Sequence, residues 1–221
     1  MSESIFLQPQ EPELIFCVDD LPVLTAQIIL PRWDSRKSAR FNRYYHACAE
    51  TFKRSCRREL LPQAESAYYH ARENSTAIPQ WQAQLHATVT LQREYLLSLR
   101  SDTVFAGMPQ PYSARRGDTW DLRHGFLLSL ADCFPLHTPW RRQMLELACD
   151  RIRDWEAQGS ARYHDDWHRQ IHRSFHAHNF YLTEDGLCFF FPFASIAPPI
   201  EGIPTFCMPY HSQAGPFIPN P

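Results

Sequence analysis

The stretch that decides the fold is NFYLTEDGLCFFF, residues 179–191. Two runs of apolar and aromatic residues, 180–182 and 187–191, flank the polar residues TEDG. Short runs of this kind, separated by a turn that contains Gly, predict a β-hairpin. We expect Asp185 and Gly186 to supply a residue that tolerates positive φ in the turn. We also expect the hairpin to complete a sheet that earlier strands begin.

Upstream of the hairpin, the spacing of apolar residues predicts the strands of that sheet. Residues 85–91 alternate with period two, which is typical of a half-buried strand, and residues 95–105 repeat the pattern. Residues 118–122 predict a third strand of this meander. Further strands are predicted at 14–18, at 23–30 where Pro31 ends the strand, and at 205–209.

Several other segments show the spacing of helices. Residues 39–60 place apolar side chains every three or four positions on one face, and Pro62 predicts a break before a helix resumes at 64–72. Residues 138–158 begin with Thr-Pro, a favourable helix start, and residues 163–177 predict another helix. Runs of strands and runs of helices, without regular βαβ alternation, predict the α+β class. The predicted architecture is an antiparallel meander sheet packed against helices and completed by a C-terminal hairpin.

Length and composition fit one globular domain. The chain has 221 residues, of which 44% are hydrophobic and 21% charged, so a sizeable core can form. We predict a single domain over residues 14–213, made of a strand and long helix at 14–84 and a second part at 85–213. Residues 1–13 and 214–221 are predicted to be flexible tails. A formal net charge of −2 gives no global field that would attract nucleic acid or an anionic membrane.

The cysteines predict a reducing environment. Their number, seven, is odd, and no CxxC pair occurs, which argues against a zinc knuckle and against a disulfide framework. The first ten residues lack the layout of a signal peptide, and no apolar run approaches the roughly 18 residues of a membrane span. We therefore predict a cytoplasmic location and no membrane span.

Three stretches together carry a resemblance to a known family. They are Leu97–Leu99 with Asp118–Leu122, then Asn179–Leu187 with Phe189–Phe191, and finally Ile196–Pro198 with Met208–Tyr210. This order resembles the C-terminal domain of RsiV-like anti-sigma factors, and a similar domain accompanies some peptidoglycan deacetylase domains. The resemblance covers about residues 85–213. It implies a sensor domain that binds a protein, since RsiV-type domains lie outside the cell and bind lysozyme, and it implies no cofactor.

The candidate contact surface is the loop expected at residues 106–116. Family members often carry a distinctive loop at this place, between the second and third strands of the meander. The segment here contains Met108, Tyr112, Arg115 and Arg116. Tyr, Met and Arg are enriched at protein interfaces. We predict these four residues as the partner-binding site; the alternative is an ordinary meander loop.

The alternative function is a metal-dependent hydrolase. His164, His168, His172 and His176 are each four residues apart, so one helix would place them on one face, where two imidazoles can share a metal ion. The alternative interpretation is a solvated polar stripe. The HExxH motif of zinc proteases is absent, and the sequence indicates no third ligand.

Two further groups of residues have a functional and a structural interpretation. Cys188 with His178 and Asp185 suggests a nucleophile, yet a Cys in so apolar a strand is typical of a buried core residue. A basic cluster, formed by Arg43, Lys53, Arg54, Arg57 and Arg58, suggests nucleic-acid contact, but such a run is usually a solvated helix face. We predict a protein partner, no catalytic residue and no nucleic acid.

Overall fold

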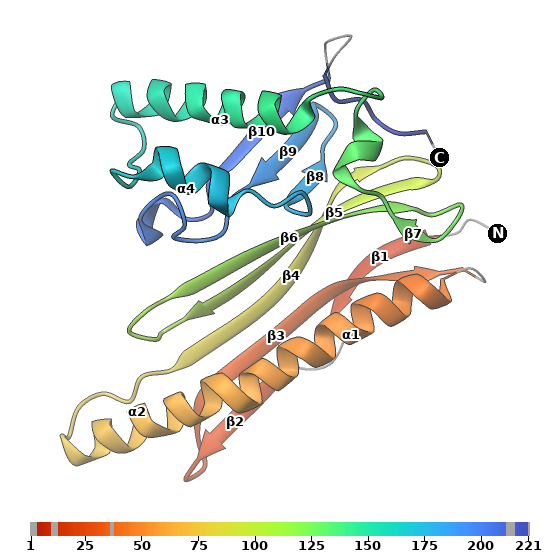
Figure 1. The fold of residues 1–221 in the computed structure, drawn as a ribbon. Coiled ribbons are helices and arrows are strands. Elements are labelled where there is room, and N and C mark those ends of the chain that lie inside the picture. The colour runs from red at the N-terminus through yellow and green to blue at the C-terminus, as the bar shows by residue number, and fades with distance from the viewer. Residues whose placement is uncertain (1–3, 10–12, 36–37, 211–214, 221) are drawn as a thin grey trace. The chain divides into compact units, whose positions relative to one another are not determined.

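The computed structural model describes residues 4–9, 13–35, 38–210 and 215–220. The predicted α+β class is confirmed, with helices, a large and mostly antiparallel sheet, and a separate C-terminal sheet (Figure 1). The chain forms two compact units. The N-terminal unit comprises Met1–Thr88 and Ser101–Ser113, and the C-terminal unit comprises Val89–Arg100 and Ala114–Pro221.

The large sheet has the strand order β1-β3-β4-β5-β6-β7, and β2 also pairs with β3. Its strands are β1 (Ser4–Pro9), β2 (Leu14–Val18), β3 (Leu21–Asp34), β4 (Trp81–Gln92), β5 (Leu96–Ala106), β6 (Tyr112–Asp121) and β7 (Phe126–Leu127). β4, β5 and β6 each pass from one unit into the other. The pairing of β3 with β4 is parallel, from Leu24 opposite Trp81 to Ile29 opposite His86. A parallel pair needs a long crossover, which the helices between these two strands supply.

The N-terminal strands differ from the prediction at two points. Ser4–Pro9, expected in a flexible tail, forms β1 and pairs antiparallel with β3. β3 also continues past Pro31, which lies opposite Leu7 in that pair. Pairing with a distant strand therefore overrides two local signals, the polar neighbours of Ile5–Leu7 and the proline in β3.

One continuous helical layer covers β3. It consists of α1 (Ala39–Ser55), a π-helical turn η1 (Cys56–Leu60) and α2 (Leu61–Glu73). The predicted apolar stripe of α1 is buried, and the ring centroids of Trp33 and Phe41 lie 5.9 Å apart. The Asn42 side chain pairs with the Trp33 backbone, accepting from its N–H at 3.0 Å and donating to its carbonyl at 2.9 Å. These two hydrogen bonds fix the start of α1 next to the end of β3.

Pro62 does not break the helix. Proline has no N–H to donate and its ring clashes with the carbonyl four residues earlier. Here the preceding turn is widened, and the Leu61 N–H donates to the Cys56 carbonyl five residues back. The π-turn therefore accommodates Pro62 near the start of α2 instead of ending the helix.

The C-terminal unit packs two helices against a small sheet. Its elements are η2 (Leu130–Cys133), α3 (Trp140–Ala157), α4 (Trp167–Ser174), β8 (Phe180–Leu182), β9 (Gly186–Phe190), η3 (Pro199–Glu201) and β10 (Thr205–Pro209). Buried side chains from α3, α4 and the strands form one core, in which Trp155 of α3 stacks on Phe206 of β10 at 5.5 Å. The chain end also belongs to this unit, because the Phe217 N–H donates to the Cys133 carbonyl at 2.9 Å. Residues 215–220 are thus packed, not a flexible tail as predicted.

The predicted hairpin is confirmed, but the expectation that it completes the sheet of the earlier strands is wrong. β8 and β9 pair antiparallel, and β10 pairs with β9, giving the order β10-β9-β8. This sheet is separate from the large one. Gly186 does not adopt positive φ. It is needed for a different reason, because a Cβ at that position would lie 2.4 Å from the Met208 carbonyl oxygen on β10.

A disulfide joins Cys188 of β9 to Cys207 of β10, which corrects the expectation that the chain has none. The two residues are directly opposite in the antiparallel register, with Cα atoms 4.0 Å apart. Spacing in the sequence did not reveal the pair, because only the strand register brings the two side chains together.

Candidate partner-binding surface

The loop predicted to bind a partner is shorter than expected. β5 ends at Ala106 and β6 begins at Tyr112, so residues 107–111 form the loop. The Tyr112 ring stacks on Phe105 with centroids 5.5 Å apart, and the residue stays 46% exposed. Met108 is half-buried. Next to the loop, the first residue of β6 therefore presents an aromatic ring that is stacked on Phe105 and partly exposed.

Gly107 fixes the base of this loop. Its φ is +79°, a conformation that favours glycine, and a Cβ there would lie 2.2 Å from the Gln80 carbonyl oxygen. The loop base therefore packs directly on the backbone that precedes β4. A loop anchored in this way keeps its shape, which lowers the entropic cost of binding.

Arg115 and Arg116, the other two predicted contact residues, lie in β6 and not in a loop. Arg115 Nη1 donates to Thr205 Oγ1 at 2.8 Å, and its guanidinium lies 5.9 Å from the centroid of the Phe190 ring. Arg116 Nε donates to Asp118 Oδ2 at 3.1 Å, where the carboxylate is almost fully buried. Arg115 thus joins β6 to β10 in the C-terminal unit and Arg116 pairs within β6, whereas Met108 and Tyr112 belong to the N-terminal unit. The four residues do not form one patch within a single unit.

The histidine stripe does not lie on one helix. α4 covers only residues 167–174, so it contains His168 and His172, while His164 precedes it and His176 follows it. The helix predicted over 163–177 is shorter because Phe175, packed in the core, has an extended backbone with ψ of 119°. His168 stacks on Trp167 at 3.8 Å. Among the described residues, no group of three or more His, Cys, Asp or Glu side chains is placed to hold a metal ion.

The structure distinguishes the two interpretations of Cys188, a nucleophile and a buried structural residue. Cys188 is in the disulfide and so offers no thiol as a nucleophile. Burial raises the pKa of Cys133 to about 12 and that of Cys56 to about 11. These two thiols therefore stay protonated and unreactive near neutral pH.

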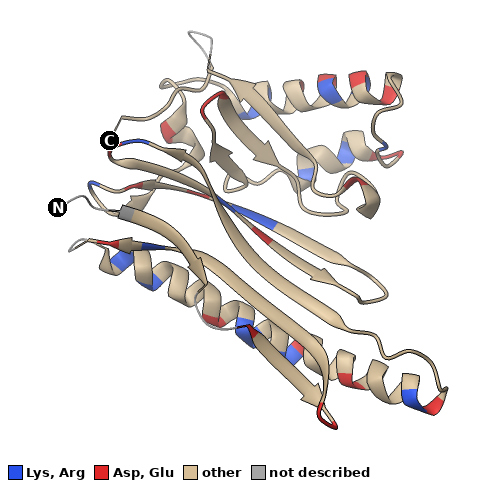
Figure 2. Ribbon diagram, turned by 180° about the vertical axis from the view of Figure 1, so that it is seen from behind, with Lys and Arg blue, Asp and Glu red and all other residues tan. Residues whose placement is uncertain are grey.

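The basic cluster on α1 and η1 is not uniformly basic. Lys53 is buried and its Nζ lies 2.9 Å from Glu50 Oε1, a hydrogen bond and charge that lower the pKa of Glu50. Arg54, Arg57 and Arg58 surround a small hollow of about 290 Å³ together with Glu50. Acidic residues are interspersed among the basic ones along α1, η1 and α2 (Figure 2). This pattern is that of a mixed, solvated helix face.

Sequence reasoning missed the role of the buried hydroxyls in the family-like motifs. Ser98 Oγ of β5 lies 3.0 Å from Thr119 Oγ1 of β6. The Leu182 N–H of β8 donates to the same Ser98 Oγ at 2.8 Å. Gly117 of β6 also approaches β8 closely, since a Cβ there would lie 1.7 Å from the Phe180 carbonyl oxygen. These residues join the meander strands to the hairpin within the C-terminal unit, which gives the motifs a structural purpose.

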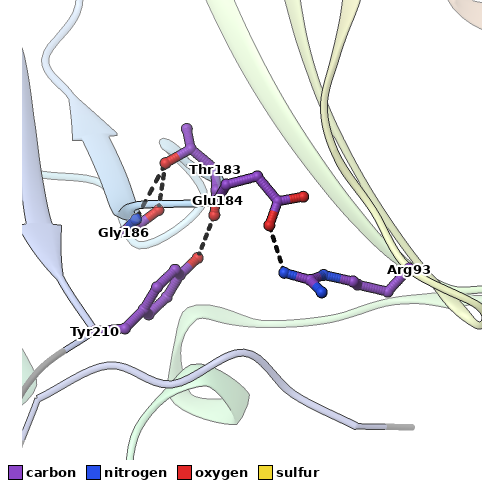
Figure 3. A network of polar contacts seen from close by, with 5 residues as sticks. All are labelled: Arg93, Thr183, Glu184, Gly186 and Tyr210. Atoms are coloured by element: carbon purple, nitrogen blue, oxygen red, sulfur yellow. Dashed lines mark hydrogen bonds and ion pairs between the residues drawn. The ribbon is translucent and has the colours of Figure 1, made fainter.

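The β8–β9 turn is held by the Thr183 side chain within the turn and by Tyr210 and Arg93 from outside it (Figure 3). Thr183 Oγ1 donates to the Gly186 carbonyl at 2.9 Å and accepts from the Gly186 N–H at 3.1 Å. The Tyr210 hydroxyl donates to the Thr183 carbonyl at 3.0 Å, and burial raises the pKa of Tyr210. Arg93, in the turn between β4 and β5, forms an ion pair with Glu184. The most family-like stretch of the sequence is thus engaged in internal contacts.

In a comparison with known protein families, one segment of the chain matches. Residues 142–211 match a family described as protein of unknown function (DUF3298). They span most of α3, then α4 and β8 to β10, the elements that build the core of the C-terminal unit. Among curated proteins, none matches the chain.

Solved structures of DUF3298-family proteins share the fold over nearly the whole chain. A member from Bacteroides fragilis has a TM-score of 0.60 at 15% identity, covering 94% of this chain and 91% of that one. A member from Pseudomonas aeruginosa PAO1 has a TM-score of 0.50 at 16% identity, covering 95% and 89%. At such identities the likeness shows the fold alone. Of the described helices, none is long and apolar enough to cross a membrane.

Proposed function

We propose that this protein is a non-catalytic binding domain that recognises a protein partner through the β5–β6 loop and Tyr112 beside it. The observation that carries the proposal is Tyr112, an aromatic ring supported by Phe105 and still 46% exposed, on a loop whose base is fixed at Gly107. Aromatic anchors of this kind supply much of the binding energy at protein interfaces. Met108 lies in the same loop and adds an adaptable apolar contact.

The kind of partner follows from the resemblance to RsiV-type sensor domains. In RsiV-type proteins, the C-terminal domain binds lysozyme. Residues 142–211 match a family of unknown function, so this part of the proposal rests on the sequence resemblance. We therefore propose an envelope-related partner, with a lysozyme as the first candidate. We also propose that Arg115 and Arg116, which bond to residues of the C-terminal unit, do not touch the partner.

The cellular location forms part of this proposal. The cytoplasmic location stays a prediction from the sequence, and the Cys188–Cys207 disulfide weighs against it. Structural disulfides persist mainly in oxidising compartments. We propose that the protein works in such a compartment, as RsiV-type domains do. Thiol titration of protein isolated from the native host without reductant measures this directly, because the proposal predicts that Cys188 and Cys207 are not labelled.

The binding test compares two exposed tyrosines of the same unit. The full chain is immobilised and exposed to purified chicken-type lysozyme and, separately, to an envelope extract of the native host. Tyr112→Ala should reduce capture of the partner about tenfold or more, the loss typical of an aromatic anchor. Tyr69→Ala is the matched control, since Tyr69 of α2 is 53% exposed and also contacts another ring, that of Tyr68, edge-on.

Three outcomes decide the proposal. Lysozyme captured by the wild type and by Tyr69→Ala, but not by Tyr112→Ala, supports both the surface and the partner. A different protein with the same dependence supports the surface and replaces lysozyme as the partner. No protein that depends on Tyr112 contradicts the proposal.

A further inference from the structure

An open groove of about 830 Å³ runs along α3 in the C-terminal unit. It begins at Thr138, before the helix, and follows one face of α3 to Arg153, with His172 of α4 at its side. The α3 residues from 142 to 153 that line it are spaced three and four apart, so they share one helix face.

The walls of the groove are mostly apolar. Leu145 lies at the edge of the core and is 7% exposed, while Trp140 and Cys149 flank it and are half-buried. A volume of this size is typical of sites that hold a small organic molecule, which are apolar hollows with a few polar groups that fix orientation. The apolar part of a ligand would lie along these three side chains.

The charges at the groove are unevenly balanced. Arg153 Nη1 lies 3.0 Å from Asp150 Oδ1, and Arg142 Nε lies 3.6 Å from Glu146 Oε1, so two of the three arginines face carboxylates. Within the part of the chain that the structure describes, Arg141 faces none. Its Nη2 donates to the His172 carbonyl at 3.5 Å, and its guanidinium lies 5.5 Å from the centroid of the Phe175 ring.

The position of Arg141 adds to the excess of positive charge at this end of the groove. It lies in the first turn of α3, which contains no acidic residue. The partial positive charge of a helix N-terminus favours an anion at that place. The groove therefore has a cationic end next to an apolar floor.

We propose that this groove binds a small amphiphilic carboxylate. The carboxylate pairs with the Arg141 guanidinium, and the alkyl or aromatic body lies along Trp140, Leu145 and Cys149. A guanidinium matches a carboxylate in geometry, and its hydrogen bonds are charge-assisted. The site is independent of the proposed function, because it lies in the C-terminal unit and shares no residue with the β5–β6 loop.

The test uses decanoate as the probe on the full chain, below its micelle concentration. Isothermal titration should show saturable binding, about tenfold tighter than that of decanol and of decylammonium, since only decanoate carries the matching charge. Arg141→Gln should remove this preference. Arg151→Gln is the matched control on the same helix, because Arg151 is exposed and does not line the groove.

A second measurement on the unaltered chain locates the ligand. Bound decanoate should slow the alkylation of Cys149 at least threefold, while exposed Cys17 reacts at an unchanged rate, as peptide mass spectrometry can follow. The proposal is overturned if decanoate does not bind, if decylammonium binds as tightly, if Arg141→Gln binds decanoate as the wild type does, or if Cys149 is not protected. These outcomes leave the Tyr112 surface untouched, so the two proposals fail separately.

Discussion

The β8–β9 turn and the β5–β6 loop both reverse the chain between neighbouring strands, but different contacts stabilise them. Side-chain hydrogen bonds and an ion pair hold the turn, whereas close backbone packing at one glycine holds the loop. The β8–β9 turn is held by Thr183 on Gly186, by Tyr210 on the Thr183 carbonyl and by Arg93 on Glu184. The β5–β6 loop is fixed at its base by the close packing of Gly107 on Gln80 and presents Tyr112 to solvent.

The difference separates residues that maintain the fold from residues available to a partner. Polar groups of the β8–β9 turn are satisfied by neighbours in the same unit, so a partner would have to break those contacts to use them. The Tyr112 ring is 46% exposed beside a loop with a fixed base, so a partner can bury more of it at a low entropic cost. Substitutions in the hairpin region should therefore change stability, and substitutions in the loop should change binding.

The largest expected effect is that of Gly117→Ala. Its new Cβ would lie 1.7 Å from the Phe180 carbonyl oxygen, so β6 and β8 must move apart. We expect the free energy of unfolding to fall by about 4 kcal/mol, measured by urea denaturation. Gly159→Ala is the control, because a Cβ there meets no atom within 4 Å although φ is +65°. It should cost only about 1 kcal/mol, and equal losses in the two variants would contradict the close packing of the hairpin.

The next effect is that of replacing Cys188 and Cys207 together by Ala. The bond closes a segment with a sequence separation of 19, and crosslinks of that size contribute about 3 kcal/mol, chiefly by restricting the unfolded chain. Urea denaturation of the double variant should show this loss, and reductant should destabilise the wild type by a similar amount. A wild type that is insensitive to reductant and as stable as the double variant would show that the bond does not form.

A smaller loss of stability is expected for Thr183→Val. The substitution keeps the shape of the side chain but removes the hydroxyl that both donates to and accepts from Gly186. We expect a loss of about 1.5 kcal/mol in the free energy of unfolding. No loss would mean that solvent replaces both hydrogen bonds, and the contrast between turn and loop would weaken.

The smallest effect on stability is expected at the loop. Tyr112→Ala removes a ring that is stacked on Phe105 but still largely in contact with water. We expect about 0.5 kcal/mol, the range of ordinary surface substitutions. Thermal denaturation monitored by circular dichroism is sufficient to measure it, and a loss above that of Thr183→Val would assign Tyr112 to the fold.

The elements with strong local patterns were predictable from the sequence. The hairpin followed from apolar and aromatic runs that flank turn residues, and β10 has the predicted bounds Thr205–Pro209. Features that depend on distant pairing were not predictable. β1 exists because β3 pairs with it, the Cys188–Cys207 bond depends on register, and nothing local in the sequence shows that Gly117 meets Phe180.

The candidate site was predicted only in part. Met108 and Tyr112 lie where the sequence placed them, in or beside the loop. Arg115 and Arg116 were assigned to the same surface because β6 was expected to begin at residue 118. The strand begins six residues earlier, at Tyr112, which places both arginines on internal partners. Composition alone could not distinguish an interface arginine from one that stabilises a strand.

The most direct test of the account is quantitative mass spectrometry of the proteins captured from one host envelope extract by the wild type, Tyr112→Ala and Thr183→Val. The account predicts a protein that the wild type and Thr183→Val capture equally and that Tyr112→Ala captures at least tenfold less. A protein lost with Thr183→Val and retained by Tyr112→Ala would contradict it, because the hairpin, and not the loop, would then be the contact surface.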